Sequence, residues 1–93
     1  MTAAADRTLF LIWLDTSLTD EDCTPLSDLG SWFLLNENLL LIHSAQTRSK
    51  VYHAVKHMFQ PEALMAAPLK DAPKFKGMNE GALNWVRALP EDG

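Results

Sequence analysis

The sequence predicts an α+β domain built on a four-stranded antiparallel sheet, and two observations lead to that fold class. The first is a set of short apolar runs, rich in Leu, Ile, Phe and Trp and separated by polar turns, which is typical of strands. The second is a run with apolar residues at helical spacing between the third and fourth of these strands. The 93 residues fit one domain, 1–93, with an ordered core over about 8–89.

The first strand is predicted over Thr8–Asp15, where apolar residues occupy successive positions. Helix is the competing interpretation, but a run of this length before a polar turn favours a strand. Such a strand needs cover on both faces of its sheet. Strand alternation divides its side chains into two sets: Leu9, Leu11, Trp13 and Asp15 on one face, and Phe10, Ile12 and Leu14 on the other.

A short helix is expected after the polar loop 16–22. Thr24 is the predicted N-cap and Pro25 the first helical residue, because proline needs no intrahelical donor there. Gly30 is expected to end the helix in a left-handed conformation. A start at Asp20 is disfavoured, since it would place Pro25 inside the helix.

Two further strands, Ser31–Leu35 and Leu39–His43, are predicted to form a hairpin. Their connection, 36–38, reads Asn-Glu-Asn and contains residues that tolerate positive φ. The helix that follows begins with Ser44 or Thr47 as its N-cap. Its apolar stripe consists of Val51, Val55, Met58 and Phe59.

The C-terminal third contains a fourth strand, Ala63–Ala67, which Pro68 is expected to close and which suits a sheet edge. A loop over 69–78 follows, and its Phe75 is expected to lie beneath it as a hydrophobic plug. The last helix is predicted over Glu80–Leu89, with Asn79 as its N-cap.

The predicted order of elements, β-α-β-β-α-β plus a terminal helix, is the ferredoxin-like pattern. Right-handed crossovers then make the first and third strands central and the second and fourth strands edges. The two main helices pack on one face of the sheet.

Several stretches resemble one family of small bacterial proteins. They are Asp15 at the end of the first strand, the step 29–33 (Leu-Gly-Ser-Trp-Phe), Thr47 before the second helix, and above all the tail Gly77-x-Asn79-Glu80-x-x-x-x-Trp85. Together they resemble the SinR-like family of small uncharacterised proteins, over most of 9–89. That family is related in fold to the small CRISPR adaptation nuclease-like proteins. The resemblance implies the ferredoxin-like fold and no defined activity.

Charge and cysteine content narrow the class of protein. Cys23 is the single cysteine, so no internal disulfide forms, and a lone thiol fits a reducing compartment. The N-terminal segment does not read as a signal peptide, and the run 9–14 is too short to span a membrane. We therefore expect a cytoplasmic protein without membrane association. The net charge of −4 does not favour general nucleic-acid binding.

Acidic and basic residues are segregated along the chain. Between Thr8 and Thr47 there is no Lys or Arg, whereas the basic residues are concentrated between Arg48 and Lys76. The candidate residues for nucleic-acid or anion binding are Arg48, Lys50, Lys56, Lys74 and Lys76. The other interpretation is that both charged sets are simply solvated.

Asp15 is the candidate catalytic residue. In the CRISPR adaptation relatives, the resemblance implies, an aspartate at this position is paired across a two-fold axis and holds a metal. Two carboxylates near one Mg²⁺ can support phosphodiester hydrolysis. The simpler interpretation is a turn-forming aspartate. No cofactor and no metal site are predicted otherwise, because His53 and His57, although four residues apart, lie among lysines and lack a third ligand.

Taken together, these observations favour a non-catalytic homodimeric interaction or regulatory module. The alternatives are a metal-dependent nuclease centred on Asp15 and nucleic-acid binding without cleavage. The dimer is expected because the strands are apolar on both faces while the two main helices cover one of them. The competing interpretation is a monomer in which the terminal helix and the loop 69–78 close the second face.

Overall fold

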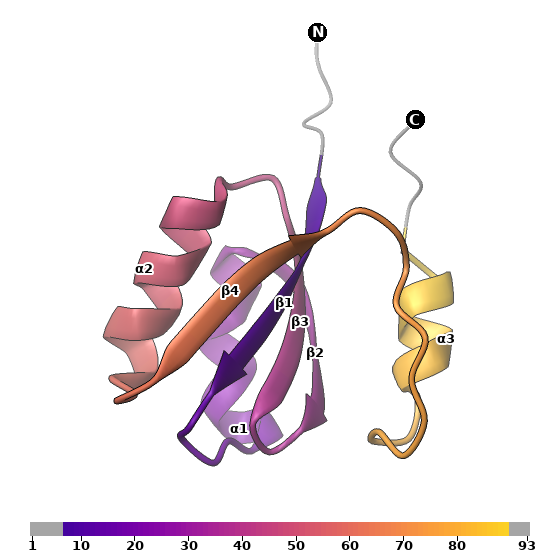
Figure 1. Ribbon diagram of the computed structural model, residues 1–93, viewed down its shortest axis with the longest axis horizontal. Coiled ribbons are helices and arrows are strands. Elements are labelled where there is room, and N and C mark those ends of the chain that lie inside the picture. The colour runs from indigo at the N-terminus through magenta and orange to yellow at the C-terminus, as the bar shows by residue number, and fades with distance from the viewer. Residues whose placement is uncertain (1–6, 90–93) are drawn as a thin grey trace, which may run out of the picture.

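A four-stranded antiparallel sheet forms the middle layer of the computed structural model, which describes residues 7–89 (Figure 1). Its strands are β1 (Thr8–Leu14), β2 (Gly30–Asn36), β3 (Leu39–Ser44) and β4 (Leu64–Leu69). They lie in the order β2-β3-β1-β4, with every neighbouring pair antiparallel. The predicted α+β class is therefore confirmed, and the first and third strands are central, as the order of elements led us to expect.

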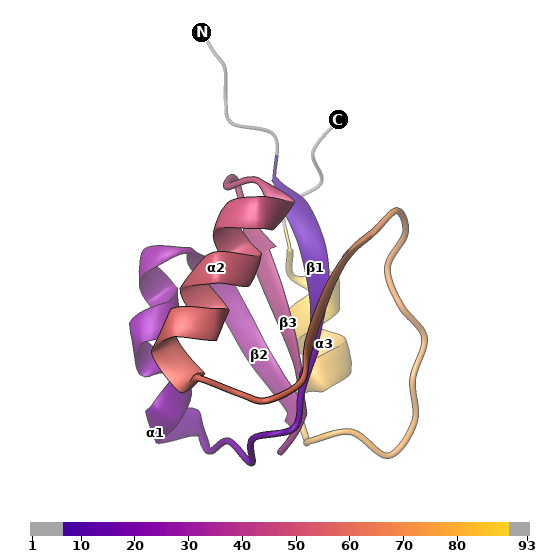
Figure 2. The same cartoon turned by 60° about the vertical axis from the view of Figure 1, so that its left-hand side comes forward.

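The first face of the sheet is covered by α2 (Arg48–Phe59) together with α1 (Asp20–Cys23) and the 3₁₀ helix η1 (Thr24–Asp28) (Figure 2). The side chain of Thr47 accepts a hydrogen bond from the Lys50 amide, so Thr47, not Ser44, is the N-cap of α2. The buried residues of this first core are Phe10, Ile12, Leu14, Leu18, Cys23, Leu26, Leu34, Leu40, Ile42, Val51 and Val55.

The predicted short helix at Thr24 is present as the 3₁₀ helix η1, but Thr24 is not its N-cap and an α-helical turn precedes it. That turn, α1, begins after Thr19, whose hydroxyl accepts from the Asp22 amide while the Asp22 carboxylate accepts from the Thr19 amide. This capping box stabilises an earlier start. Pro25 is tolerated because the α-helix ends at Cys23 and the chain continues as a 3₁₀ helix, with Pro25 in its first turn.

The hairpin has a shorter connection than predicted. Asn36 is the last residue of β2, so only Glu37 and Asn38 form the turn. Leu34 pairs with Leu40 and Asn36 with Leu39, which makes Leu35 the extra residue of a β-bulge. Contrary to the prediction, Gly30 does not end a helix.

Gly30 instead opens β2 with a φ of +154°, and a Cβ at this position would collide with the carbonyl oxygen of His43. Glycine is therefore required by the close approach of β2 to β3. Gly30 therefore marks a boundary between two elements, as its glycine suggested, but the boundary is the start of β2 and not the end of a helix.

The second face of the sheet is covered by α3 (Ala82–Arg87) and by the segment 70–81, both of which lie opposite α2 (Figure 1). Leu35, Leu41, Ala82 and Val86 are buried there. Half-buried residues surround them: Leu9, Leu11, Phe33, Leu39, Leu69, Phe75, Met78 and Trp85. Phe75 thus packs against the sheet as expected, and the chain itself covers much of this face.

The start and length of the last helix differ from the prediction. Its N-cap is Gly81, with a φ of +92°, and no side chain caps it. Asn79 is not the N-cap, because its side-chain amide binds the carbonyl oxygen of Leu34 on β2. The helix is consequently six residues long rather than ten.

The fourth strand is an edge strand, as predicted, but Pro68 lies inside it instead of closing it. Pro68 pairs with Phe10 of β1. A proline in a strand has its nitrogen on the side without a partner, so the outer edge of β4 lacks one hydrogen-bond donor.

Among residues 7–89, no helix has the length and apolarity needed to cross a membrane.

Candidate functional site

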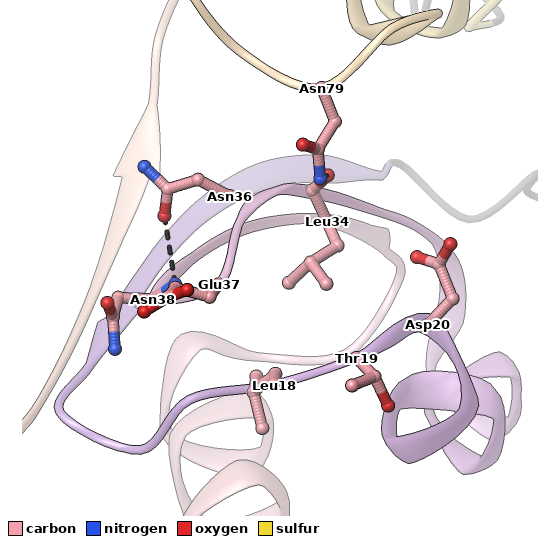
Figure 3. A pocket seen from close by; sticks show the side chains of 8 residues that line it. All are labelled: Leu18, Thr19, Asp20, Leu34, Asn36, Glu37, Asn38 and Asn79. Carbon is pink, nitrogen blue, oxygen red and sulfur yellow. Dashed lines mark hydrogen bonds between the residues drawn. The ribbon is translucent and has the colours of Figure 1, made fainter.

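A pocket of about 560 Å³ lies where the β2–β3 hairpin meets the loop before α1 (Figure 3). Three segments that are distant in sequence contribute to it: the start of α1, the tip of the hairpin and the segment before α3. The residues that line it are Leu18, Thr19, Asp20, Leu34, Asn36, Glu37, Asn38 and Asn79.

The loop before α1 is tied to the hairpin turn by hydrogen bonds to Glu37. The Leu18 amide donates to the carbonyl oxygen of Glu37 at 2.8 Å. The Ser17 hydroxyl donates to the Glu37 carboxylate at 3.0 Å. These bonds hold the side chain of Leu18, which is buried, at the floor of the pocket beside the hairpin.

Asn38 makes a second connection between the same two segments. Its side-chain nitrogen donates to the carbonyl oxygens of Leu14 at 3.1 Å and of Thr16 at 3.3 Å. Its backbone amide donates to the side-chain oxygen of Asn36 at 2.9 Å. The hairpin tip is therefore fixed by side-chain amides as well as by the ladder.

Asn79 brings the third segment to the pocket. Its backbone amide donates to the carbonyl oxygen of Leu35 at 2.8 Å, and its side-chain nitrogen donates to that of Leu34 at 2.9 Å. Both acceptors belong to the edge strand β2. Figure 3 shows the Asn79 side chain directed toward Leu34, with Asp20 on another side of the pocket.

The sequence did not predict this pocket. The tripeptide 36–38 predicts only a turn, and Asn79 predicts only a helix cap. The sequence signal for the pocket is limited to Asn, Asp and Glu residues close to the ends of predicted helices and strands. Ordinary turns are rich in the same residues, so this signal does not distinguish a pocket from a turn. Only the folded chain shows that these ends meet.

Asp15, the predicted catalytic residue, lies outside the pocket. Its carboxylate accepts a hydrogen bond from the Glu62 amide at 3.1 Å, and its own amide donates to the carbonyl oxygen of Ala63 at 3.2 Å. The side chain is exposed and joins the end of β1 to the segment before β4.

In the part of the chain from Arg7 to Leu89, no group of three or more His, Cys, Asp and Glu residues is placed to hold a metal ion.

The predicted anion-binding residues do not form a single surface. Arg48, Lys50 and Lys56 are exposed on α2, which covers the first face of the sheet. Lys74 and Lys76 are exposed on the segment 70–81, beyond the second face (Figure 1). His53 and His57 are exposed on α2, and the ring of His53 contacts that of Tyr52 edge-on at 5.2 Å between centroids.

Two large apolar side chains remain exposed on the sheet itself. Trp13 on β1 and Met65 on β4 are direct cross-strand partners, and they are 39% and 52% exposed. Trp13 shares its strand face with Leu9 and Leu11, which pack under α3 and the segment 70–81. This pair, the Trp13–Met65 patch, is an apolar part of the second face that the described residues leave open.

Comparison of the chain with protein-family models, with curated proteins and with solved structures finds no significant match.

Proposed function

We propose that this protein is a small non-catalytic interaction module of the cytoplasm, with a ferredoxin-like fold and a homodimeric assembly. The strand order β2-β3-β1-β4 and the position of α1 and α2 on one face of the sheet support the ferredoxin-like fold. We also propose membership of the SinR-like family. The resemblance consists of Asp15, the step 29–33, Thr47 and the tail from Gly77 to Trp85.

The observation that carries the homodimer is the Trp13–Met65 patch. Adjacent exposed Trp and Met side chains on a sheet face are a favourable contact for a second apolar surface, and a two-fold axis supplies an identical one. Because the patch lies on β1 and β4 and involves no residue of α3, two copies can place their patches against each other through the sheet face.

The outer edge of β4 contributes less to the assembly. An edge strand offers unpaired backbone groups to another chain, but Pro68 removes one donor from this edge. We therefore assign the contact mainly to side chains on the sheet face. A contact centred on two large residues falls short of the ~800 Å² per partner of a standard stable interface, so we expect a micromolar dissociation constant.

Sedimentation equilibrium over a range of concentrations tests the homodimer. We expect the mass to rise from 10.4 kDa toward twice that value with concentration. Met65→Lys places a charge in the patch and should weaken association at least tenfold. Leu83→Lys is the matched control, because Leu83 is similarly exposed but belongs to α3. A constant 10.4 kDa for folded wild-type protein at all concentrations would rule out the dimer.

The metal-dependent nuclease remains the second candidate. What favours it is that Asp15 directly follows the end of β1, two residues beyond Trp13, so a two-fold axis at the patch would place two such carboxylates near the same interface. Asp15→Asn keeps the oxygen that accepts from Glu62 and removes only the charge. Cleavage of DNA or RNA that requires Mg²⁺ or Mn²⁺ and disappears in this variant would replace the non-catalytic proposal.

Nucleic-acid binding without cleavage is the third candidate. Arg48, Lys50 and Lys56 on α2 are the residues that would carry it. Reversing two of these charges should then abolish retention on heparin at low salt. Absence of retention for the wild type under these conditions would exclude it.

A further inference from the structure

We propose that Met65 is a site of reversible oxidation by peroxides, and that its sulfoxide separates the two copies of the dimer. Met65 is 52% exposed on β4, directly opposite Trp13 on β1. These two strands lie side by side in the sheet (Figure 1). The effect on assembly rests on the proposed homodimer, whereas the reactivity of Met65 follows from the structure of a single chain.

Met65 is the methionine most open to a reagent in solution. Met58 and Met78 are partly buried and pack against the hydrophobic clusters of the first and second faces. Met1 lies outside the described residues, and among residues 7–89 only Met65 is an exposed methionine. Because a peroxide must reach the thioether sulfur, susceptibility to oxidation follows exposure. Selective reaction at Met65 is therefore expected.

The thiol of Cys23, the other reducible sulfur group in the chain, does not compete. Cys23 is fully buried in the first core. The thiolate is the form that peroxides oxidise, and burial, with the carboxylates of Asp20 and Asp22, raises the pKa of Cys23 to about 11. The thiol is therefore protonated as well as inaccessible at neutral pH, and a peroxide reacts with Met65 first.

The oxidation transfers one oxygen atom and two electrons. A lone pair of the Met65 sulfur attacks one oxygen of the peroxide, so that an S–O bond forms and the O–O bond breaks. The other oxygen takes up the proton and leaves as water from hydrogen peroxide, or as an alcohol from an alkyl hydroperoxide. Methionine sulfoxide reductases reverse the change with thiols as the reductant: the sulfoxide oxygen leaves as water while two thiols form a disulfide.

The sulfoxide changes the patch from apolar to polar. Its oxygen is hydrated in the monomer and loses that hydration when a second copy covers it, which is unfavourable. A contact centred on Trp13 and Met65 depends strongly on each of these side chains. Covering of the patch also shields the Met65 sulfur from peroxide. Association and oxidation therefore oppose each other, and oxidation proceeds through the monomer.

Peroxide treatment of the full chain at pH 7 tests the proposal, with hydrogen peroxide as the probe. Peptide mass spectrometry measures the oxidation rate of each methionine and the state of the Cys23 thiol at several protein concentrations. We expect Met65 to react at least about tenfold faster than Met58 and Met78, and more slowly at concentrations where the protein is dimeric. Sedimentation equilibrium should give an at least tenfold higher dissociation constant for the oxidised protein, and sulfoxide reductases with dithiothreitol should restore it.

Two leucine variants are the matched controls. Met65→Leu keeps an apolar side chain of similar volume, so it should dimerise within about threefold of wild type and give the same mass before and after peroxide. Met58→Leu removes a different methionine and should stay as sensitive to peroxide as wild type. The proposal is overturned by equal oxidation rates of the three methionines, by earlier oxidation of Cys23, or by an unchanged dissociation constant after oxidation of Met65.

The same measurements separate this proposal from the homodimer. A dimer that forms without slowing the oxidation of Met65 would place the contact away from the patch and overturn control by oxidation while leaving the dimer. A constant 10.4 kDa for untreated wild type would reject the dimer and its control together. The relative oxidation rates would still decide whether Met65 is the oxidation site.

Discussion

The two faces of the sheet are covered in different ways. On the first face, a twelve-residue helix and the α1–η1 segment enclose eleven buried residues. On the second face, a six-residue helix and an extended segment bury only four residues of the hydrophobic cluster, with eight half-buried hydrophobic residues around them. A regular helix closes a face by its periodicity, whereas the second cover depends on individual anchors such as Trp85, Phe75 and Asn79.

The largest expected difference in stability is between alanine substitutions on the two faces of β1. Ile12 is fully buried in the first core, and the adjacent Leu11 is half-buried on the second face. We expect Ile12→Ala to lower the free energy of unfolding by about 3–4 kcal/mol and Leu11→Ala by about 1–2 kcal/mol. Urea unfolding measures both. Equal losses would mean that the second face is packed as tightly as the first.

Trp85 should be the main anchor of α3. Its ring packs against Phe33 of β2, with 5.8 Å between centroids and 41° between planes. Because Trp85 is only half-buried, we expect Trp85→Ala to cost about 2 kcal/mol in urea unfolding. Leu83→Ala on the same helix, where the side chain is 49% exposed, should cost about 0.5 kcal/mol or less. If the two variants were equally stable, α3 would not depend on its contact with Phe33.

Asn79 should contribute by donating a hydrogen bond rather than by capping a helix. We expect Asn79→Ala to lower the free energy of unfolding by about 1 kcal/mol, because the bond to the Leu34 carbonyl is lost. Asn79→Asp separates the two roles, since aspartate is a good N-cap but cannot donate to a carbonyl. Thermal or urea unfolding of Asn79→Asp at wild-type stability would restore the capping role.

The smallest expected effect on the free energy of unfolding is that of the Cys23 thiol, and this effect appears only at high pH. Burial, with the nearby carboxylates of Asp20 and Asp22, raises the pKa of Cys23 from its ordinary value of 9.0 to about 11. The folded chain therefore holds this proton more tightly than the unfolded chain. Its stabilising effect is complete below pH 9 and is lost as the pH rises toward 11.

Comparing wild type with Cys23→Ala isolates this effect. Urea unfolding between pH 8 and 11 should give a steeper loss of stability for wild type, and iodoacetamide should modify the native thiol slowly at pH 8. The same pH dependence in both proteins would show that Cys23 does not titrate as we expect.

Sequence reasoning worked best where side-chain periodicity decides the structure. Successive apolar residues in β1 indicated cover on both faces, and the spacing of Val51 and Val55 identified the inner side of α2. It failed where a tertiary contact competes with a local preference. Asn79 binds Leu34 instead of capping a helix, and Gly30 serves the approach of β2 to β3.

The candidate sites were harder to predict because they depend on which segments meet. The predicted basic residues Lys50 and Lys74 are separated by the sheet, although the sequence placed both in one basic stretch. The pocket was missed because Asp20, Glu37 and Asn79 come from segments far apart in the chain. The exposed Trp13–Met65 pair requires the register of β1 with β4, which no local pattern reveals.

The central position of β1 has a consequence for synthesis of the chain. This strand is synthesised before the other three, and its two neighbours in the sheet begin only at Leu39 and Leu64. Until those strands follow, an apolar strand has no partner on either edge, a state that invites pairing with other chains. Folding of the sheet is thus delayed until β4 has left the ribosome, and a chaperone that binds short apolar segments would find a target in β1.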